Sequence, residues 1–171
     1  MKRIVAILLL LVLTVGALSA CSKDQTAPDG MKNVATENDK FYFYVPTTWV
    51  EKEHGATSPN ADGSNVLVTT QLLGKAHTPD SFWQEECVPT FSAIFDEFEL
   101  IEDSCGTTFL GGVDAGKYVY RVTLAGSSYW YMDVLAVYGN LVYRLTYTAT
   151  AENFETHLAD VELMCSEFVF R

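Results

Sequence analysis

The fold of this 171-residue chain is decided by residues 117–149, which read KYVYRVTLAGSSYWYMDVLAVYGNLVYRLTYTA. Residues 117–124 and 141–149 alternate with a period of two, and residues 129–138 are largely apolar on both faces. A period of two is that of a β-strand. Residues 125–128 predict the first turn, and Gly139-Asn140 predicts a two-residue hairpin turn with positive φ. The stretch therefore predicts a three-stranded antiparallel meander with an apolar face that must be covered.

Two segments outside the meander carry helix signals. Thr150 is the predicted N-cap of a helix that ends near Glu162 or Cys165 and places its apolar residues on one side. Thr78-Pro79-Asp80 predicts another helix start, and Pro89 predicts either a kink in that helix or two short helices. Its predicted core-facing stripe, at spacing i, i+3, i+4 and i+7, consists of Phe91, Ile94, Phe95 and Phe98.

The remaining segments predict short strands and turns. Strands are expected at residues 41–46, 66–73, 99–104, 107–110 and 167–170. Asp62-Gly63 predicts a hairpin turn, and the oxygen-bearing side chains of residues 60–65 leave a calcium loop as the alternative. Strands that occur in runs, with two helices inserted rather than alternating, are typical of the α+β class.

The N-terminus has the layout of a bacterial lipoprotein signal. Lys2 and Arg3 precede the wholly apolar run Ile4–Leu13, and residues 18–21 read Leu-Ser-Ala-Cys. Small residues before a cysteine resemble a lipobox, which predicts cleavage between Ala20 and Cys21 and a lipid on the Cys21 sulfur. The alternatives are a chance cysteine after an ordinary cleavage site and a retained membrane span, although a span needs about 20 apolar residues.

The rest of the chain is predicted to hold one domain behind a tether. Residues 1–20 are the predicted signal peptide, residues 21–38 a solvated tether poor in large apolar side chains, and residues 39–171 a single domain. Two or three acyl chains on Cys21 would make a durable anchor. We therefore expect an extracytoplasmic protein that is anchored by lipid to a bacterial membrane in the cell envelope.

The charge of the chain argues against several classes of partner. It carries 22 acidic and 11 basic residues, and the leader holds two of the basic ones, so the processed chain would have a formal charge of −13. Such a surface repels phosphate backbones and anionic lipid head groups. Nucleic acid is therefore not an expected partner, and contact with the membrane is expected through the lipid alone.

Three cysteines remain after Cys21, and their redox state is open at the level of sequence. An odd count outside the cytosol predicts either one bridge, with Cys87 and Cys105 as the candidate pair, or three reduced thiols. In the second case Cys87, Cys105 and Cys165 would be small buried hydrophobic residues.

Two parts of the chain resemble a known family. Phe43-Tyr-Val-Pro46-Thr-Thr-Trp49 opens the domain, and Leu141-Val-Tyr-Arg-Leu-Thr-Tyr-Thr-Ala149 is followed by a predicted helix with an early Phe154 and a Ser-Glu-Phe168 ending. This pattern is similar to the PsbP/Mog-type (PsbP-like) domain of the extrinsic oxygen-evolving subunit and of small bacterial lipoproteins, over roughly residues 41–171. The resemblance implies a curved antiparallel β-sheet with helices packed on both sides and a non-enzymatic accessory or binding role. It carries over no catalytic residue.

Few residues suggest chemistry. His54, His77 and His157 lack metal-ligand spacing, and no Gly-x-Ser-x-Gly elbow or phosphate loop is present. We therefore expect no catalytic residue, metal site or cofactor. The remaining candidates for a ligand or partner surface are four aromatic residues, Trp49, Trp83, Tyr129 and Tyr131. The favoured interpretation is that helices cover both faces of the sheet and bury such rings, and the alternative is that one aromatic set lines a groove.

The leading hypothesis is a lipid-anchored envelope protein that binds a protein partner or a small ligand and has an accessory or assembly role. The alternatives are a lipid-anchored hydrolase without a recognisable motif and a module that captures a solute for a transporter. A pocket that gathers titratable groups would favour the enzyme, a dry apolar pocket a ligand binder, and a bare aromatic patch a protein partner.

Overall fold

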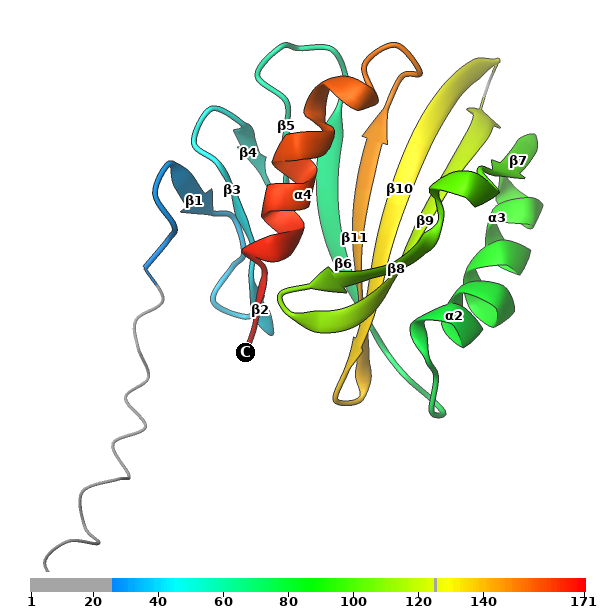
Figure 1. The fold of residues 1–171 in the computed structure, drawn as a ribbon, viewed down its shortest axis with the longest axis horizontal. Coiled ribbons are helices and arrows are strands. Elements are labelled where there is room, and N and C mark those ends of the chain that lie inside the picture. The colour runs from blue at the N-terminus through cyan, green and yellow to red at the C-terminus, as the bar shows by residue number, and fades with distance from the viewer. Residues whose placement is uncertain (1–25, 125) are drawn as a thin grey trace, which may run out of the picture.

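A computed structural model of the chain describes residues 26–124 and 126–171. The predicted signal peptide, Cys21 and the first residues of the tether lie outside this part of the chain. The central meander is confirmed: β9 (Val113–Leu124), β10 (Ser127–Tyr138) and β11 (Leu141–Ala149) pair antiparallel in that order (Figure 1). Gly139 has a φ of 63°, as the predicted hairpin turn requires.

Five shorter strands extend the meander into an open antiparallel sheet. β6 (Asn65–Leu72) pairs with β11, and β5 (Gly55–Thr57) and β4 (Val50–Lys52) continue on that side. At the other edge, β7 (Glu97–Leu100) and β8 (Gly106–Leu110) both pair with β9, one after the other along its length. Residues 58–64 connect β5 and β6, so the predicted hairpin around Asp62-Gly63 is correct.

One face of the sheet is covered by a helical segment with three parts: α2 (Pro79–Phe82), the π-helical turn η1 (Trp83–Cys87) and α3 (Val88–Ile94). Thr78 is the predicted N-cap and forms a capping box with Ser81. Pro89 is the second residue of α3 and lies in its first turn, where its missing N–H costs little. Two short helices joined by a π turn therefore replace one kinked helix.

The predicted phenylalanine stripe is wrong in part. The helix ends at Ile94, whose side chain is 59% exposed, and Phe98 belongs to β7. Phe91 is buried as expected. The rings of Phe95 and Phe98 still pack against Phe91, with centroid distances of 5.8 and 5.9 Å, because the chain reverses into β7. Phe91 and Phe98 therefore do contact each other, but Phe98 reaches Phe91 from a strand and not from the same helix.

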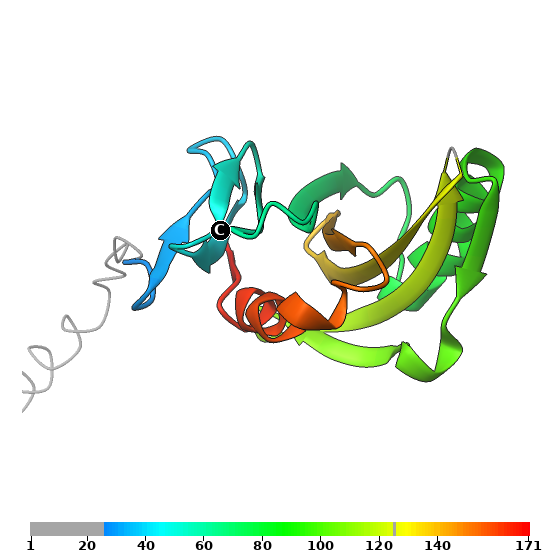
Figure 2. The same ribbon diagram turned by 90° about the horizontal axis from the view of Figure 1, so that it is seen from above.

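The opposite face is covered by α4 (Leu158–Ser166), which follows the short 3₁₀ turn η3 (Glu155–His157) (Figures 1 and 2). Thr150 is not the N-cap. The Tyr147 hydroxyl donates to the carbonyls of Asn153 and Phe154 at 3.3 and 3.0 Å, and these bonds hold residues 150–154 in a turn. The helix therefore begins later than predicted, and the expected closing strand is β12 (Val169–Phe170).

The second half of the predicted tether is part of the domain. β1 (Met31–Asn33) pairs with β3 (Tyr44–Pro46), and β2 (Phe41–Tyr42) pairs with β12. Met31 and Val34 are buried in the core on the α4 side. Pairing with β3 and burial of these two apolar side chains stabilise a short strand in a segment whose overall composition is polar.

The sheet thus has two apolar layers, one on each face, as the family resemblance implied. The core on the α4 side includes Trp49, Phe154 and Phe168, and the core on the α2–α3 side includes Trp83, Phe91 and Tyr120. Figure 2 shows the curved sheet with α4 and the α2–α3 segment on its two sides. Among the described residues, no helix has the length and apolar character needed to cross a membrane.

Candidate functional site

A groove lies between the start of the α2–η1 segment and the β8–β9 hairpin, and we call it the Trp83 groove. Its volume is about 750 Å³, which is within the range of ligand sites in proteins. Thr78, Asp80 and Gln84 form one wall, and residues of β8 and the first part of β9 form the other. The groove is mostly apolar, because its walls carry Trp83, Leu100, Phe109 and Tyr118.

The floor of the groove is built from two stacked rings. Trp83 is fully buried, and its ring centroid is 4.2 Å from that of Tyr118 with an angle of 3° between the planes. The capping box at Thr78 sets where the helix begins, and this start places Trp83 over β9. The indole N–H of Trp83 has no hydrogen-bond partner among the described residues. Burying an unsatisfied N–H costs about 1–3 kcal/mol, so the packing of these rings must outweigh that cost.

The rim of the groove carries two carboxylates and one exposed ring. The Tyr118 hydroxyl donates to Asp80 at 3.5 Å, and burial together with the Asp80 charge raises the pKa of Tyr118. Asp114 lines the groove from β9. Phe109 is 60% exposed although it stands on a strand. The groove therefore combines an apolar floor with acidic and aromatic edges.

β8 forms the other wall and has an unpaired edge. Gly111 and Gly112, with φ of 55° and 79°, form the two-residue turn that joins β8 to β9, and Leu110 pairs with Val113 across it. In such a hairpin, alternate residues point their N–H and C=O groups toward the partner strand. Thr107 and Phe109 therefore direct theirs away from β9, and no other described strand pairs with β8.

A buried carboxylate lies deeper under the same helical segment. Asp133 on β10 is fully buried and accepts hydrogen bonds from the Tyr120 hydroxyl at 3.0 Å and from Thr146 Oγ1 at 2.5 Å. Burial raises the pKa of Asp133, and the nearby Arg144 charge acts against that rise. The same burial, together with the Asp133 charge, raises the pKa of Tyr120. These groups hold the strands together and do not line the Trp83 groove.

The three described cysteines are free, and the structure does not contain the candidate Cys87–Cys105 bridge; Cys87 and Cys165 are buried, whereas Cys105 is half-buried. Burial raises the pKa of Cys87 to about 11 and that of Cys165 to about 12. Thiols with such pKa values are poor nucleophiles at neutral pH. Cys105 instead accepts a hydrogen bond from the Val119 N–H at 3.3 Å.

The structure separates the four aromatic residues that the sequence offered as a surface. Trp49 and Trp83 are buried, so neither forms an exposed aromatic patch, although Trp83 lies beneath the Trp83 groove. Trp49 packs on the α4 side, where its indole N–H donates to Asp160 at 2.9 Å. Tyr129 and Tyr131 are half-buried, and Tyr131 stacks on Tyr120 with a centroid distance of 5.2 Å. Helices cover both faces of the sheet, as the favoured interpretation of the sequence expected.

The histidines take structural positions. His157 Nε2 lies 2.8 Å from Asp62 Oδ2, and its ring packs edge-on against Trp49 at 5.3 Å. Among the described residues, no group of three or more His, Cys, Asp or Glu side chains could hold a metal ion. The oxygen-rich loop at residues 60–65 is a turn, in which Asp62 accepts from Ser58 and from the Ser64 N–H.

Sequence reasoning missed three features: the edge of β8, Asp133 and Arg144. Asp133 and Arg144 are each the one charged residue of a mostly apolar strand. A lone charge in such a strand could have marked both residues from the sequence. The edge of β8 had no signal in the sequence, because it depends on which strand lies beside β9.

No protein-family model and no curated protein sequence matches the chain. Solved structures do match it. Cyanobacterial PsbP (CyanoP) from Synechocystis sp. PCC 6803 is 14% identical with a TM-score of 0.59, and the match covers 91% of this chain and all of CyanoP.

Two further structures cover most of both chains. LpqN, involved in cell envelope biogenesis of Mycobacterium tuberculosis, is 14% identical with a TM-score of 0.58, over 81% of this chain and 89% of LpqN. The Ran-binding protein Mog1p of Saccharomyces cerevisiae is 8% identical with a TM-score of 0.56, over 82% of this chain and 95% of Mog1p. At these identities the likeness shows the fold, and the chain has the PsbP/Mog-like α+β fold.

Proposed function

We propose that this chain is a lipid-anchored protein of the bacterial cell envelope that acts by binding and not by catalysis. Its partner would be an extended segment of another protein, which pairs with the free edge of β8 and places apolar side chains in the Trp83 groove. The role would be that of an accessory or assembly factor held close to the membrane.

One observation carries this proposal: the unpaired edge of β8 forms one wall of the apolar groove. Addition of a strand to a sheet edge gains affinity from main-chain hydrogen bonds, and neighbouring pockets select the side chains. Thr107 and Phe109 supply the outward N–H and C=O groups, and the Trp83–Tyr118 floor supplies the pocket.

Charge at the rim further defines the segment. Asp80 and Asp114 flank the groove in a chain whose formal charge is −11. Opposite charges at the edge of an interface raise the association rate and fix the register. The proposed segment therefore carries apolar residues at alternate positions and a Lys or Arg beside them.

The titratable groups near the groove support binding over hydrolysis. Burial and the charge of Asp80 raise the pKa of Tyr118, which lines the groove, so its hydroxyl is not prepared to act as a base at neutral pH.

The location rests on residues 18–21. Leu-Ser-Ala-Cys after a basic and apolar leader supports attachment of lipid to Cys21. LpqN, which shares the fold, is described as involved in cell envelope biogenesis, and this agrees with an envelope location. Cys21→Ala should abolish labelling by a radioactive fatty acid, whereas Cys105→Ala should retain it. Labelling of the Cys21→Ala protein would contradict the anchor.

Site-specific photocrosslinking tests the partner. We would replace Phe109 by p-benzoylphenylalanine in cells that make the full-length protein, with Tyr138, which is 47% exposed on β10, as the matched control position. A discrete protein adduct is expected from position 109 and not from position 138.

A second substitution shows whether strand pairing holds that partner. Thr107→Pro removes an outward N–H and should leave the β8–β9 hydrogen bonds in place, whereas Thr107→Val keeps the N–H in a side chain of similar shape. We expect the adduct to be lost in Thr107→Pro and kept in Thr107→Val, with equal melting temperatures. An absent adduct, or one that survives Thr107→Pro, would overturn the proposed binding mode.

A further inference from the structure

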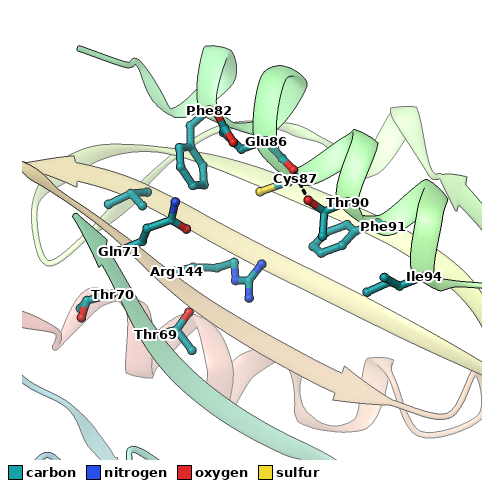
Figure 3. A pocket seen from close by; sticks show the side chains of 11 residues that line it. Thr69, Thr70, Gln71, Phe82, Glu86, Cys87, Thr90, Phe91, Ile94 and Arg144 are labelled. Carbon is teal, nitrogen blue, oxygen red and sulfur yellow. Dashed lines mark hydrogen bonds between the residues drawn. The ribbon is translucent and has the colours of Figure 1, made fainter. Parts of the chain in front are cut away.

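A second cavity lies on the other side of the helical segment, and we call it the Arg144 cleft. It has a volume of about 440 Å³ and opens between η1–α3 on one side and strands β6 and β11 on the other. Figure 3 shows Arg144 extended across it, between Thr69 and Gln71 on the sheet and Cys87 and Phe91 on the helical side. The Trp83 groove shares none of these residues.

Arg144 reaches the cleft because of its register. It stands on β11 directly opposite Thr69 of β6 and Leu135 of β10, on the face that the helical segment covers. The helical segment packs over β9 and β10, and β6 lies beyond it, so Thr69 and Gln71 are exposed. A strip of the sheet beside Arg144 thus has no helix above it, and this strip is the floor of the cleft.

Within the described part of the chain, Arg144 has no close carboxylate partner of its own, although the Cys87 thiol and the buried Asp133 interact with its guanidinium. It forms no ion pair with any described residue, and its buried Nε has no hydrogen-bond partner among them. Asp133 lies near enough to interact through its charge, but its oxygens accept from Tyr120 and Thr146. By contrast, the guanidinium of Arg121 is paired with Glu99.

The walls around Arg144 differ in character. The ring of Phe91 lies 5.7 Å from the Arg144 guanidinium carbon, and Phe82 and Ile94 continue this apolar wall. The sheet side offers the hydroxyl of Thr69 and the amide of Gln71. A planar guanidinium with hydroxyl and amide donors beside it is suited to a carboxylate, and the apolar wall is suited to a hydrocarbon body.

We propose that the Arg144 cleft binds a small amphipathic organic acid, with its carboxylate on Arg144 and its hydrocarbon part against Phe91 and Ile94. A monoanion fits better than a phosphate, because Glu86 also lines the cleft and the chain as a whole is strongly negative. This site is separate from the proposed partner groove and can be occupied independently of it.

Two matched probe pairs test the proposal: benzoate against benzamide, and hexanoate against hexanamide. Each pair has nearly the same shape and differs in charge. Binding to the full-length natively expressed protein would be measured at neutral pH by saturation-transfer NMR. We expect at least one acid to bind five times more tightly than its amide. Equal binding of acid and amide in both pairs would overturn the proposal.

Variants assign the preference to the cleft. Arg144→Gln should reduce the acid-to-amide ratio to within twofold of one, whereas Arg121→Gln, which removes the same charge elsewhere on the sheet, should preserve it. A preference that survives Arg144→Gln would also overturn the proposal.

Circular dichroism would reveal whether Arg144→Gln folds. If it does not fold, a second variant still tests the site. Ile94→Glu changes an exposed side chain at the edge of the cleft and should weaken acid binding at least threefold with little effect on the amide. An unchanged acid affinity in Ile94→Glu would count against the site. Crosslinking at Phe109 reports on the Trp83 groove alone, so failure of either proposal can be recognised separately.

Discussion

Asp133 is a carboxyl group that lies inside an apolar layer and accepts hydrogen bonds from two hydroxyl groups. Its pKa is raised by folding, whereas the pKa of a paired surface acid is usually lowered. Burial raises the pKa of Asp133 above its ordinary value, so the folded state holds a proton that the unfolded state has released. The stability contributed by this group is therefore fully present below about pH 4 and is lost as the pH rises through the raised pKa.

The first prediction follows from that sign. Asp133→Asn removes the titrating group but keeps its shape, so the free energy of unfolding should fall less steeply with rising pH above about pH 4 than in the wild type. Urea unfolding at half-unit steps from pH 4 to pH 8 measures both proteins. Parallel curves for the two proteins would show that Asp133 does not titrate as its burial requires.

Folding shifts the pKa of Asp62 in the opposite direction. Burial favours its neutral form, but hydrogen bonds from Ser58, His157 and the Ser64 backbone more than offset burial and lower the pKa of Asp62. Its contribution to stability is present above its ordinary pKa and is lost as the pH falls through the lowered one. It joins the β5–β6 turn to His157 at the start of α4, 95 residues away in sequence.

The second prediction is that Asp62→Ala lowers the free energy of unfolding by about 1–3 kcal/mol at neutral pH, because three donors lose their acceptor. The loss should shrink as the pH falls below about 4. Asp96→Ala, at an exposed position, is the control and should stay within about 0.5 kcal/mol of wild type. Equal effects of the two substitutions would contradict the structural role of Asp62.

Elements with strong local signals were the ones that the sequence predicted best. The period of two in β9 and β11 and the Gly139-Asn140 turn fixed the meander, and Thr78-Pro79-Asp80 located the start of α2. Helix ends and short strands were predicted less well, since they depend on distant contacts. The hydrogen bonds from the Tyr147 hydroxyl to the carbonyls of residues 153 and 154 hold a turn there, so α4 begins later than predicted. Met31 is part of β1 only because β3 lies beside it.

The third prediction concerns the start of the helical segment. The Ser81 N–H donates to Thr78 Oγ1 at 3.1 Å and the Thr78 N–H donates to Ser81 Oγ at 2.9 Å. Thr78→Ala should therefore lower the free energy of unfolding by about 1 kcal/mol. Ser92→Ala, at an exposed position in α3, should be neutral or slightly stabilising because alanine favours helix. Chemical denaturation of both variants measures this difference, and an equal loss in both would mean that the cap has no special role.

At the scale of the whole molecule, the two proposed sites arise from incomplete coverage of one sheet. The α2–α3 segment covers the middle of one face and leaves the Trp83 groove on its β8 side and the Arg144 cleft on its β6 side. The sequence could predict that helices cover both faces, because both faces are apolar. It could not predict which strips stay uncovered, since that depends on how the segment crosses strands that are far apart in the chain.

The fourth prediction concerns the charge of the whole molecule. The formal charge is −11, and the Lys75–Glu85 and Arg121–Glu99 pairs are exposed and therefore contribute little. Repulsion among the acidic residues should dominate, and salt screens it. We expect the melting temperature to rise by roughly 3–6 °C between 20 and 500 mM NaCl, as a gain of about 1 kcal/mol would produce.

Sucrose at matched osmolality controls for effects of the solvent that are not electrostatic. A melting temperature that falls with added NaCl would show that ion pairs outweigh repulsion. The acidic surface would then not lower the free energy of unfolding. A rise instead means that the chain gives up stability to keep its negative surface. Such a surface has a physical use if the partner of the Trp83 groove is basic, because binding then relieves part of the same repulsion that salt relieves.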